Sequence, residues 1–125
     1  MARGCLPSGS SRRYCSAVLC LVEAVIQVVS VNTAAVQDLS TPKGVVRSAI
    51  CKQARDGRIA VGELGLAGDE QADPRYHGGP GKAVYAYPQE HYEFWRTVRG
   101  QAKVAGELLP GGLGENLTLL GLQEH

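Results

Sequence analysis

The sequence lacks the cysteine spacing that marks zinc sites, because none of its four cysteines forms a C-x-x-C pair. Cys5, Cys15 and Cys20 lie within the first twenty residues, and Cys51 stands alone. A zinc site needs clustered ligands at suitable spacing, so we expect no such metal site. Free thiols in a cytosolic protein are the expected state, and a disulfide between Cys51 and either Cys15 or Cys20 stays open as the alternative.

The sequence also lacks an excess of basic residues and a long apolar run. Lysine and arginine number 13 against 12 acidic residues, which gives a formal net charge of +1. A nucleic-acid surface usually shows a clear basic excess. The apolar run at residues 17–22 is far shorter than the roughly 20 residues of a transmembrane helix. We therefore expect neither nucleic acid nor a membrane as a partner.

Two common nucleotide-binding motifs are absent as well. A phosphate-binding loop of the form G-x-x-x-x-G-K-[ST] would need glycine where Tyr76 stands and a hydroxyl where Ala83 stands. The dinucleotide pattern G-x-G-x-x-G fails because Gly114 is followed three residues later by Leu117. The glycine-rich segments therefore belong to neither class of nucleotide-binding domain.

What the sequence does contain is glycine, with 16 residues, and a globular share of hydrophobic residues, at 44%. Its 125 residues allow one domain. The pattern predicts a mainly β fold with one or two helices. We expect a loop at residues 32–44, a hairpin turn at residues 55–58 and a helix at residues 89–99. Strands are expected at residues 25–31, 45–52, 58–64, 83–87 and 117–120.

The expected helix carries one apolar face, formed by His91, Phe94, Trp95 and Val98 at helical spacing. Core packing is the simplest role for such a face. Cys51 lies on an expected strand, where it is interpreted as a small core residue.

Residues 1–22 differ from the rest of the chain. They contain Arg3, Arg12 and Arg13, several serines and no acidic residue. We interpret residues 1–22 as an N-terminal extension that is disordered, a targeting peptide or the product of a wrongly assigned start, and residues 23–125 as the domain. The expected location is the cytoplasm, with organelle targeting or export through residues 1–22 as the alternative.

The sequence HGGPGKAV at residues 77–84 is the strongest candidate for a binding site. Glycine permits positive φ angles and a close approach of the backbone to a ligand. Consecutive amides in such a turn can form a concave site for an anion, and a lysine adds a full positive charge. His77 could donate to the anion or relay a proton. The candidate binding residues of this loop are His77, Gly78, Gly79, Gly81 and Lys82.

A metal site is the competing interpretation of the acidic segment before this loop. Asp69, Glu70, Asp73 and His77 would suit a hard or borderline divalent ion. The spacing matches no calcium-binding loop. We favour the simpler interpretation, in which Asp69 and Asp73 accept backbone N–H groups in a tight loop, and predict no metal ligands.

Four motifs in order resemble the MOSC domain, the carboxy-terminal domain of molybdenum cofactor sulfurases. They are GDEQAD at residues 68–73, HGGPGKAV at residues 77–84, YPQEHYEFW at residues 87–95 and GENLT at residues 114–118. The resemblance covers roughly residues 25–122. The most similar branch is that of stand-alone bacterial proteins linked to hydroxylaminopurine resistance.

The resemblance implies a MOSC-type β-barrel, incomplete in this chain, and binding of the molybdenum cofactor, molybdopterin. It also implies reduction of N-hydroxylated bases, with a small-molecule substrate and an electron donor as partners. Asn116 suits the edge of a heterocycle, and Glu115 could accept from ring N–H groups. Pyridoxal phosphate binding is known as a family-level annotation, and no lysine here stands in a setting that marks a Schiff-base partner.

The chain departs from the family at one point. The cysteine thought to ligate molybdenum normally follows the GENLT motif, and this sequence ends at His125 before that stretch. The catalytic residue therefore remains unknown, and a truncated family member is expected. A non-catalytic anion or pterin-binding module and an inactive fragment are the alternatives. A barrel closes its strand edges, so an incomplete one is expected to self-associate through open edges.

Overall fold

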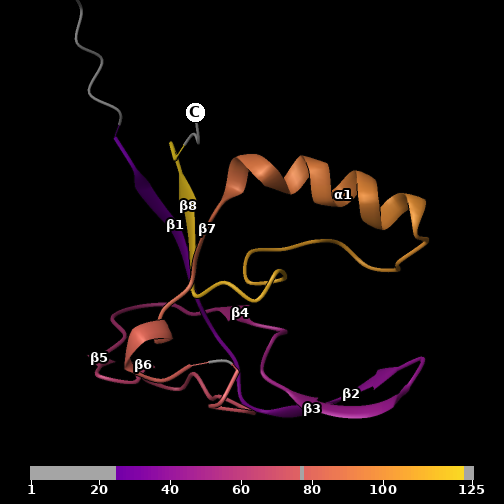
Figure 1. The fold of residues 1–125 in the computed structure, drawn as a ribbon. Coiled ribbons are helices and arrows are strands. Elements are labelled where there is room, and N and C mark those ends of the chain that lie inside the picture. The colour runs from indigo at the N-terminus through magenta and orange to yellow at the C-terminus, as the bar shows by residue number, and fades with distance from the viewer. Residues whose placement is uncertain (1–24, 77, 123–125) are drawn as a thin grey trace, which may run out of the picture.

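The computed structural model describes residues 25–76 and 78–122 (Figure 1). The expectations for residues 1–22 and for His77 therefore lie outside the described residues. The described part is mainly β, with one α-helix and two short 3-10 turns, as the sequence predicted. Its strands form one four-stranded sheet and two separate hairpins, and these do not close into a barrel.

The main sheet brings together segments from both halves of the chain, in the order β4-β1-β8-β7. β1 (Gln27–Thr33) pairs antiparallel with both β4 (Gln53–Ala54) and β8 (Leu117–Leu120). β7 (Ala86–Pro88) lies parallel to β8. The predicted strand at residues 117–120 is confirmed, whereas of the strand predicted at residues 83–87 only residues 86 and 87 lie in β7.

Two predictions for the first half of the chain were wrong. The expected loop at residues 32–44 contains β2 (Gln37–Thr41), which pairs antiparallel with β3 (Gly44–Ser48) around a tight turn. Gly44 takes φ 118° there, and Thr41 Oγ1 donates to its carbonyl at 2.7 Å, so the turn signals close a hairpin. The pair Asp56-Gly57 closes no hairpin, because β4 pairs with β1 instead of its neighbour in sequence.

The second hairpin joins β5 (Val61–Gly62) to β6 (Gly65–Leu66). The two glycines that bound its turn explain why the alternating pattern at residues 58–64 yields so short a strand. Cys51 lies in a bend after β3 and is exposed, so its expected place in the core is also wrong.

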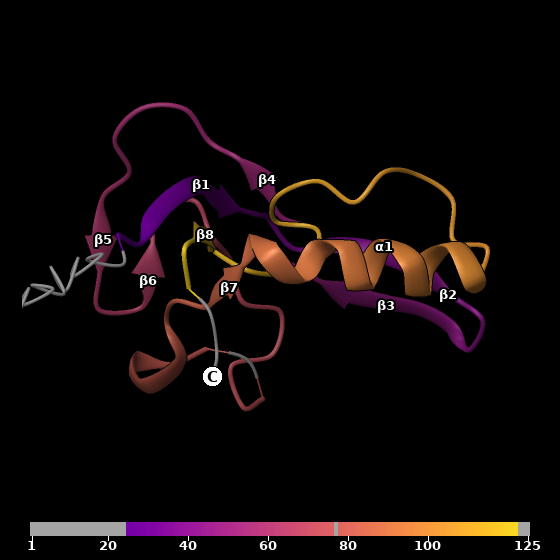
Figure 2. The same ribbon diagram turned by 90° about the horizontal axis from the view of Figure 1, so that it is seen from above.

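The predicted helix is confirmed as a 3-10 turn, η2 (Gln89–His91), that continues into α1 (Tyr92–Gln101). The predicted apolar face is confirmed in part, because His91, Trp95 and Val98 are half-buried, but the most buried residue, Tyr92, lies outside it. Tyr92 is 1% exposed and Trp95 is half-buried, whereas Phe94 is 63% exposed. Figures 1 and 2 show α1 and the β2–β3 hairpin extending from the same side of the main sheet. No helix among residues 25–76 and 78–122 is long and apolar enough to span a membrane.

The buried centre is small and largely polar. Its apolar members are Ala34, Ala49, Leu66, Tyr92 and Leu108. The largest fully buried side chains are Tyr92, Glu115, Asn32 and Thr118, of which three are polar. Hydrogen bonds therefore hold this centre together as much as apolar contact does, since a buried polar group is tolerated only when it is paired.

Large apolar side chains remain exposed on both sides of the main sheet and on the hairpins. Val28 of β1 is 57% exposed, Val45 of β3 is 67% exposed and Leu120 of β8 is 43% exposed. Exposed apolar side chains favour association when they gather on one surface. Short unpaired edges at β4 and β7 add free backbone groups.

We expect the isolated chain to self-associate through these surfaces. Sedimentation velocity should show a weight-average mass that rises with protein concentration, above that of a 13.3 kDa monomer. Replacing Val45 by lysine places a charge on an exposed strand position and should lower this mass. A monomer at all concentrations would contradict the expectation.

Candidate functional site

Glu115 occupies the centre of the buried polar network and is 0% exposed. Its Oε1 accepts from the amide of Gly111 at 2.8 Å, from the hydroxyl of Thr118 at 2.8 Å and from the hydroxyl of Tyr92. Its Oε2 accepts from the amide of Leu113 at 3.1 Å. These four donors satisfy a carboxylate that forms no ion pair with any described residue, and they connect the glycine turn before β8 to the helix.

Tyr92 is the donor that comes from α1. Burial raises the pKa of Tyr92 to about 12, and its hydrogen bond to the Glu115 carboxylate acts in the same direction. Desolvation disfavours the phenolate, and a neighbouring carboxylate disfavours it further. The phenol is therefore neutral at physiological pH and donates to Glu115.

This shift predicts a loss of stability in alkali. An unfolded tyrosine ionises near pH 10, while folded Tyr92 keeps its proton to about pH 12. The folded state therefore binds more protons in this interval, so the free energy of unfolding should fall as pH rises from 10 to 12. Urea unfolding at these pH values should show the fall, and Tyr92→Phe should flatten it relative to Tyr76→Phe, a change at an exposed tyrosine.

Asn116 joins three segments that are distant in sequence. Its Oδ1 accepts from the amide of Tyr85 at 3.1 Å, and its Nδ2 donates to the carbonyl of Asn32 at 3.2 Å and to Asp69 Oδ2 at 2.8 Å. Both N–H donors of the amide are thus used within the chain. Asn116 borders the cavity described below and retains only acceptor capacity on Oδ1.

Asp69 and Lys52 form an ion pair in the same region. Lys52 Nζ lies 2.5 Å from Asp69 Oδ1, and the two side chains are 8% and 9% exposed. Asp69 Oδ1 also accepts from the amide of Ala34 at 2.9 Å. The pair and this hydrogen bond join the acidic segment at residues 69–73 to the chain before β4 and to the end of β1. These three segments are far apart in the sequence.

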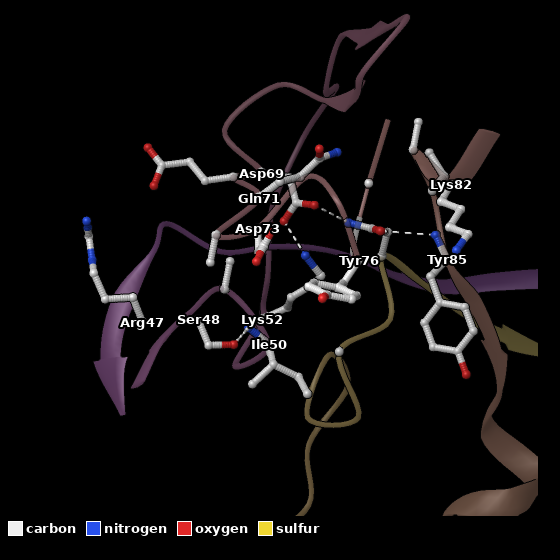
Figure 3. A pocket seen from close by; sticks show the side chains of 18 of the residues that line it. Arg47, Ser48, Ile50, Lys52, Asp69, Gln71, Asp73, Tyr76, Lys82 and Tyr85 are labelled. Carbon is white, nitrogen blue, oxygen red and sulfur yellow. Dashed lines mark hydrogen bonds and ion pairs between the residues drawn. The ribbon is translucent and has the colours of Figure 1, made fainter. Parts of the chain in front are cut away.

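A cavity of about 740 Å³ opens between these segments (Figure 3). Its walls contain apolar and aromatic side chains, including those of Ile50, Val84, Tyr76 and Tyr85. Lys52 and Asp69 lie in the wall, and Arg47 and Lys82 lie on opposite sides (Figure 3). The volume falls in the range of small-molecule and cofactor sites, roughly 300–1,000 Å³.

The charges around the cavity are mixed. Arg47, Lys52 and Lys82 line it together with Asp69, Glu70 and Asp73. The carboxylates are engaged by the chain itself: Asp69 by Lys52, Glu70 by the amide of Val36 at 2.6 Å, and Asp73 by Arg75 at 2.8 Å. Arg47 lies 3.8 Å from Asp38. Lys82 makes no ion pair with any residue that the structure describes, so it is the cation most available to an anionic ligand.

The glycine loop meets the cavity only in part. Gly78, Gly81 and Lys82 line it, whereas Gly79 does not, and its amide donates to Gln71 Oε1 at 3.2 Å. Glu115 does not line the cavity either, because it lies in the buried network. The structure therefore brings together Gly78, Gly81, Lys82 and Asn116 of the predicted site residues and separates Gly79 and Glu115 from them. His77 lies outside the described residues.

The carboxylates of the acidic segment accept hydrogen bonds from the chain itself. Asp73 accepts the amide of Arg75 at 3.1 Å within a tight loop, as the simpler interpretation predicted, whereas Asp69 accepts at 2.9 Å from the distant amide of Ala34. Within residues 25–76 and 78–122, no three histidine, cysteine, aspartate or glutamate side chains are grouped to hold a metal ion.

Sequence reasoning missed the aromatic wall and the buried pair. Tyr76 and Tyr85 flank the glycine loop in sequence, so their proximity to the loop was a usable signal. The sequence contained no comparable signal for Lys52, because its partner Asp69 lies 17 residues away and no periodicity links the two positions.

The comparisons with known proteins agree with the motif order. Residues 73–125 match the MOSC domain family. Protein YiiM of Escherichia coli strain K12 is 46% identical over 78 residues, which are 62% of this chain and 34% of that protein. A protein named Reductase from Gibberella moniliformis strain M3125 / FGSC 7600 is 35% identical over 82 residues, 66% of this chain and 14% of that protein.

A solved structure, described as the crystal structure of a hypothetical protein, is similar with a TM-score of 0.53 and 37% identity. The similarity covers 80% of this chain and 37% of that one. This chain therefore spans well under half the length of the curated relatives and the solved structure that it matches. The matched residues include the glycine-rich sequence at residues 77–84, α1 and the GENLT motif with its buried glutamate. The segment at residues 73–125 belongs to the MOSC domain family.

Proposed function

We propose that the cavity binds the organic part of the molybdenum cofactor, a flat pterin that carries a phosphate. The observation that carries the proposal is the cavity of about 740 Å³, which combines aromatic and apolar walls with the ammonium group of Lys82, a group that no described residue pairs. Tyr76 and Tyr85 offer ring faces for a heterocycle. Lys82 offers the charge for the phosphate.

The described residues fit the organic part of the cofactor and would offer its metal no thiolate in addition to the cofactor's own sulfur atoms. Asn116 Oδ1 can accept one N–H of the pterin, since its Nδ2 is engaged by Asn32 and Asp69. Gly78 and Gly81 allow close approach of the backbone to the phosphate. No cysteine lines the cavity among the described residues, and Cys51 is exposed outside it. When bound, the cofactor supplies two-electron redox chemistry.

In the whole protein, we propose, this site serves a reductase of N-hydroxylated bases and related compounds. Membership of the MOSC family supports the proposal, as does the name Reductase carried by one relative. The partners would be a small N-hydroxylated substrate and an electron donor. The test is to produce the chain with a supply of the cofactor and to measure bound molybdenum and reduction of hydroxylaminopurine.

A non-catalytic pterin-binding module is the second candidate. It is favoured by the absence of a thiol from the described lining of the cavity. The two candidates share the binding step and differ in turnover. Binding of molybdopterin without reduction of hydroxylaminopurine selects the module, and turnover with one equivalent of molybdenum selects the reductase.

Replacing Lys82 by alanine should weaken molybdopterin binding about tenfold, because one charge-assisted contact to phosphate is lost. Lys103→Ala is the matched control, since Lys103 is exposed and lies away from the cavity. Fluorescence titration of both variants measures the effect. Equal losses in the two variants would argue against a phosphate site at Lys82.

A further inference from the structure

Gln71 connects two segments next to the cavity that no strand pairing joins. Its Nε2 donates to the carbonyl of Leu64, in the turn between β5 and β6, at 3.3 Å. Its Oε1 accepts from the amide of Gly79 at 3.2 Å. The side chain is half-buried and lines the cavity (Figure 3). One amide thus ties the glycine loop to the β5–β6 hairpin.

The backbone of the loop lies directly against this amide. Gly78 has φ 111°, and a Cβ at Gly78 would come within 1.9 Å of Gln71 Cδ and Oε1. Any side chain at this position would displace either the loop or Gln71. The absence of a side chain at Gly78 is therefore what allows Gln71 to reach Gly79.

The far end of the loop contacts the same hairpin. A Cβ at Gly65 of β6 would come within 2.3 Å of the carbonyl oxygen of Ala83, so the two backbones pack closely. The β5–β6 hairpin therefore contacts the loop just after Lys82, and through Gln71 it also holds the loop just before.

Between these two contacts lies the 3-10 turn η1 (Pro80–Lys82), which ends at the unpaired lysine. The turn begins at Gly79, whose φ is 76°, and the amide of Lys82 donates to the Gly79 carbonyl at 3.0 Å. No residue of the turn is buried, so its position depends on its ends. A hydrogen bond that fixes Gly79 therefore fixes where Lys82 stands relative to the cavity.

We infer that Gln71 is a positioning residue, which acts on the anion site by holding the loop that carries Lys82. The inference rests on the proposed binding of an anionic cofactor. Lys82 supplies the charge. Gln71 restricts the glycine loop before the ligand binds, so that less conformational entropy is lost upon binding. Gln71 needs no contact with the ligand for this role.

A double-mutant cycle tests the inference, with molybdopterin and inorganic phosphate as separate probes. Gln71→Met keeps the length of the side chain, removes both hydrogen bonds and should weaken binding of each probe about tenfold. Lys82→Ala should lower the affinity about tenfold in the wild-type chain and less than threefold when Gln71→Met is present. A displaced lysine contributes less to binding, so its removal has a smaller effect. Gln37→Leu, at an exposed position on β2, is the control and should leave both affinities unchanged.

Additive effects of Gln71→Met and Lys82→Ala would overturn the inference while leaving the binding proposal intact. Coupled effects on phosphate without any molybdopterin binding would support the inference and overturn the cofactor proposal. Binding of neither probe to the wild-type chain would overturn both. Gly78→Ala is a second route to the same result, since its Cβ must move Gln71 or the loop, and it too should diminish the effect of Lys82→Ala.

Discussion

Replacing Glu115 by glutamine should lower the free energy of unfolding by about 3 kcal/mol, because the carboxylate accepts four hydrogen bonds in a site without water access. An amide has one acceptor oxygen. If that oxygen faces Gly111, Thr118 and Tyr92, the amide NH₂ must face the donating amide of Leu113. The opposite orientation is worse, since it leaves three donors facing an NH₂ group. Either way, a buried N–H loses its acceptor.

Thermal unfolding measures this effect, and a loss of this size corresponds to a fall of roughly 15 °C in the melting temperature of a domain of about 100 residues. Glu107→Gln is the matched control, since Glu107 is exposed in the connection after α1. It should change the melting temperature by no more than about 2 °C. A melting temperature of Glu115→Gln equal to that of the control would mean that the four hydrogen bonds contribute nothing net to stability.

The role of Glu115 shows how far sequence reasoning reached into the site. The motif GENLT singled out Glu115 and Asn116 as candidate cofactor-binding positions. Their side chains, however, are used to join β1, α1 and the glycine turn instead of pointing together at a ligand. A polar motif in a sequence does not reveal whether its donors and acceptors form hydrogen bonds within the protein or remain available to a ligand. The answer depends on which distant segments pack against the motif.

Elements with a local signal were predicted well, and elements that depend on distant partners were not. The apolar run of β8 and the helical spacing of α1 are properties of single segments. The polar strand β2 exists because β3 pairs with it, and β4 because β1 does. Likewise Tyr92, which the helical pattern left out, is buried because Glu115 offers its hydroxyl an acceptor. Tertiary pairing overrode local propensity in each case.

Replacing Lys52 by methionine should cost about 3–5 kcal/mol of stability, because it removes the countercharge of a carboxylate that is 9% exposed. Asp69 would keep its hydrogen bonds from Ala34 and Asn116, which do not cancel a full buried charge. Urea unfolding with an unchanged denaturant slope measures the loss as stability alone. Arg47→Met is the matched control, since it breaks an exposed ion pair with Asp38 and should cost less than about 1 kcal/mol.

The double variant Lys52→Met with Asp69→Asn separates the interaction from its parts. If the two side chains stabilise the fold chiefly through each other, the loss in the double variant should be smaller than the sum of the single losses by about 1–3 kcal/mol. Additive losses would mean that each residue acts through separate contacts. Because Asp69 also holds Asn116 at the cavity, the same measurement decides whether the wall of the proposed binding site depends on this ion pair or on hydrogen bonds alone.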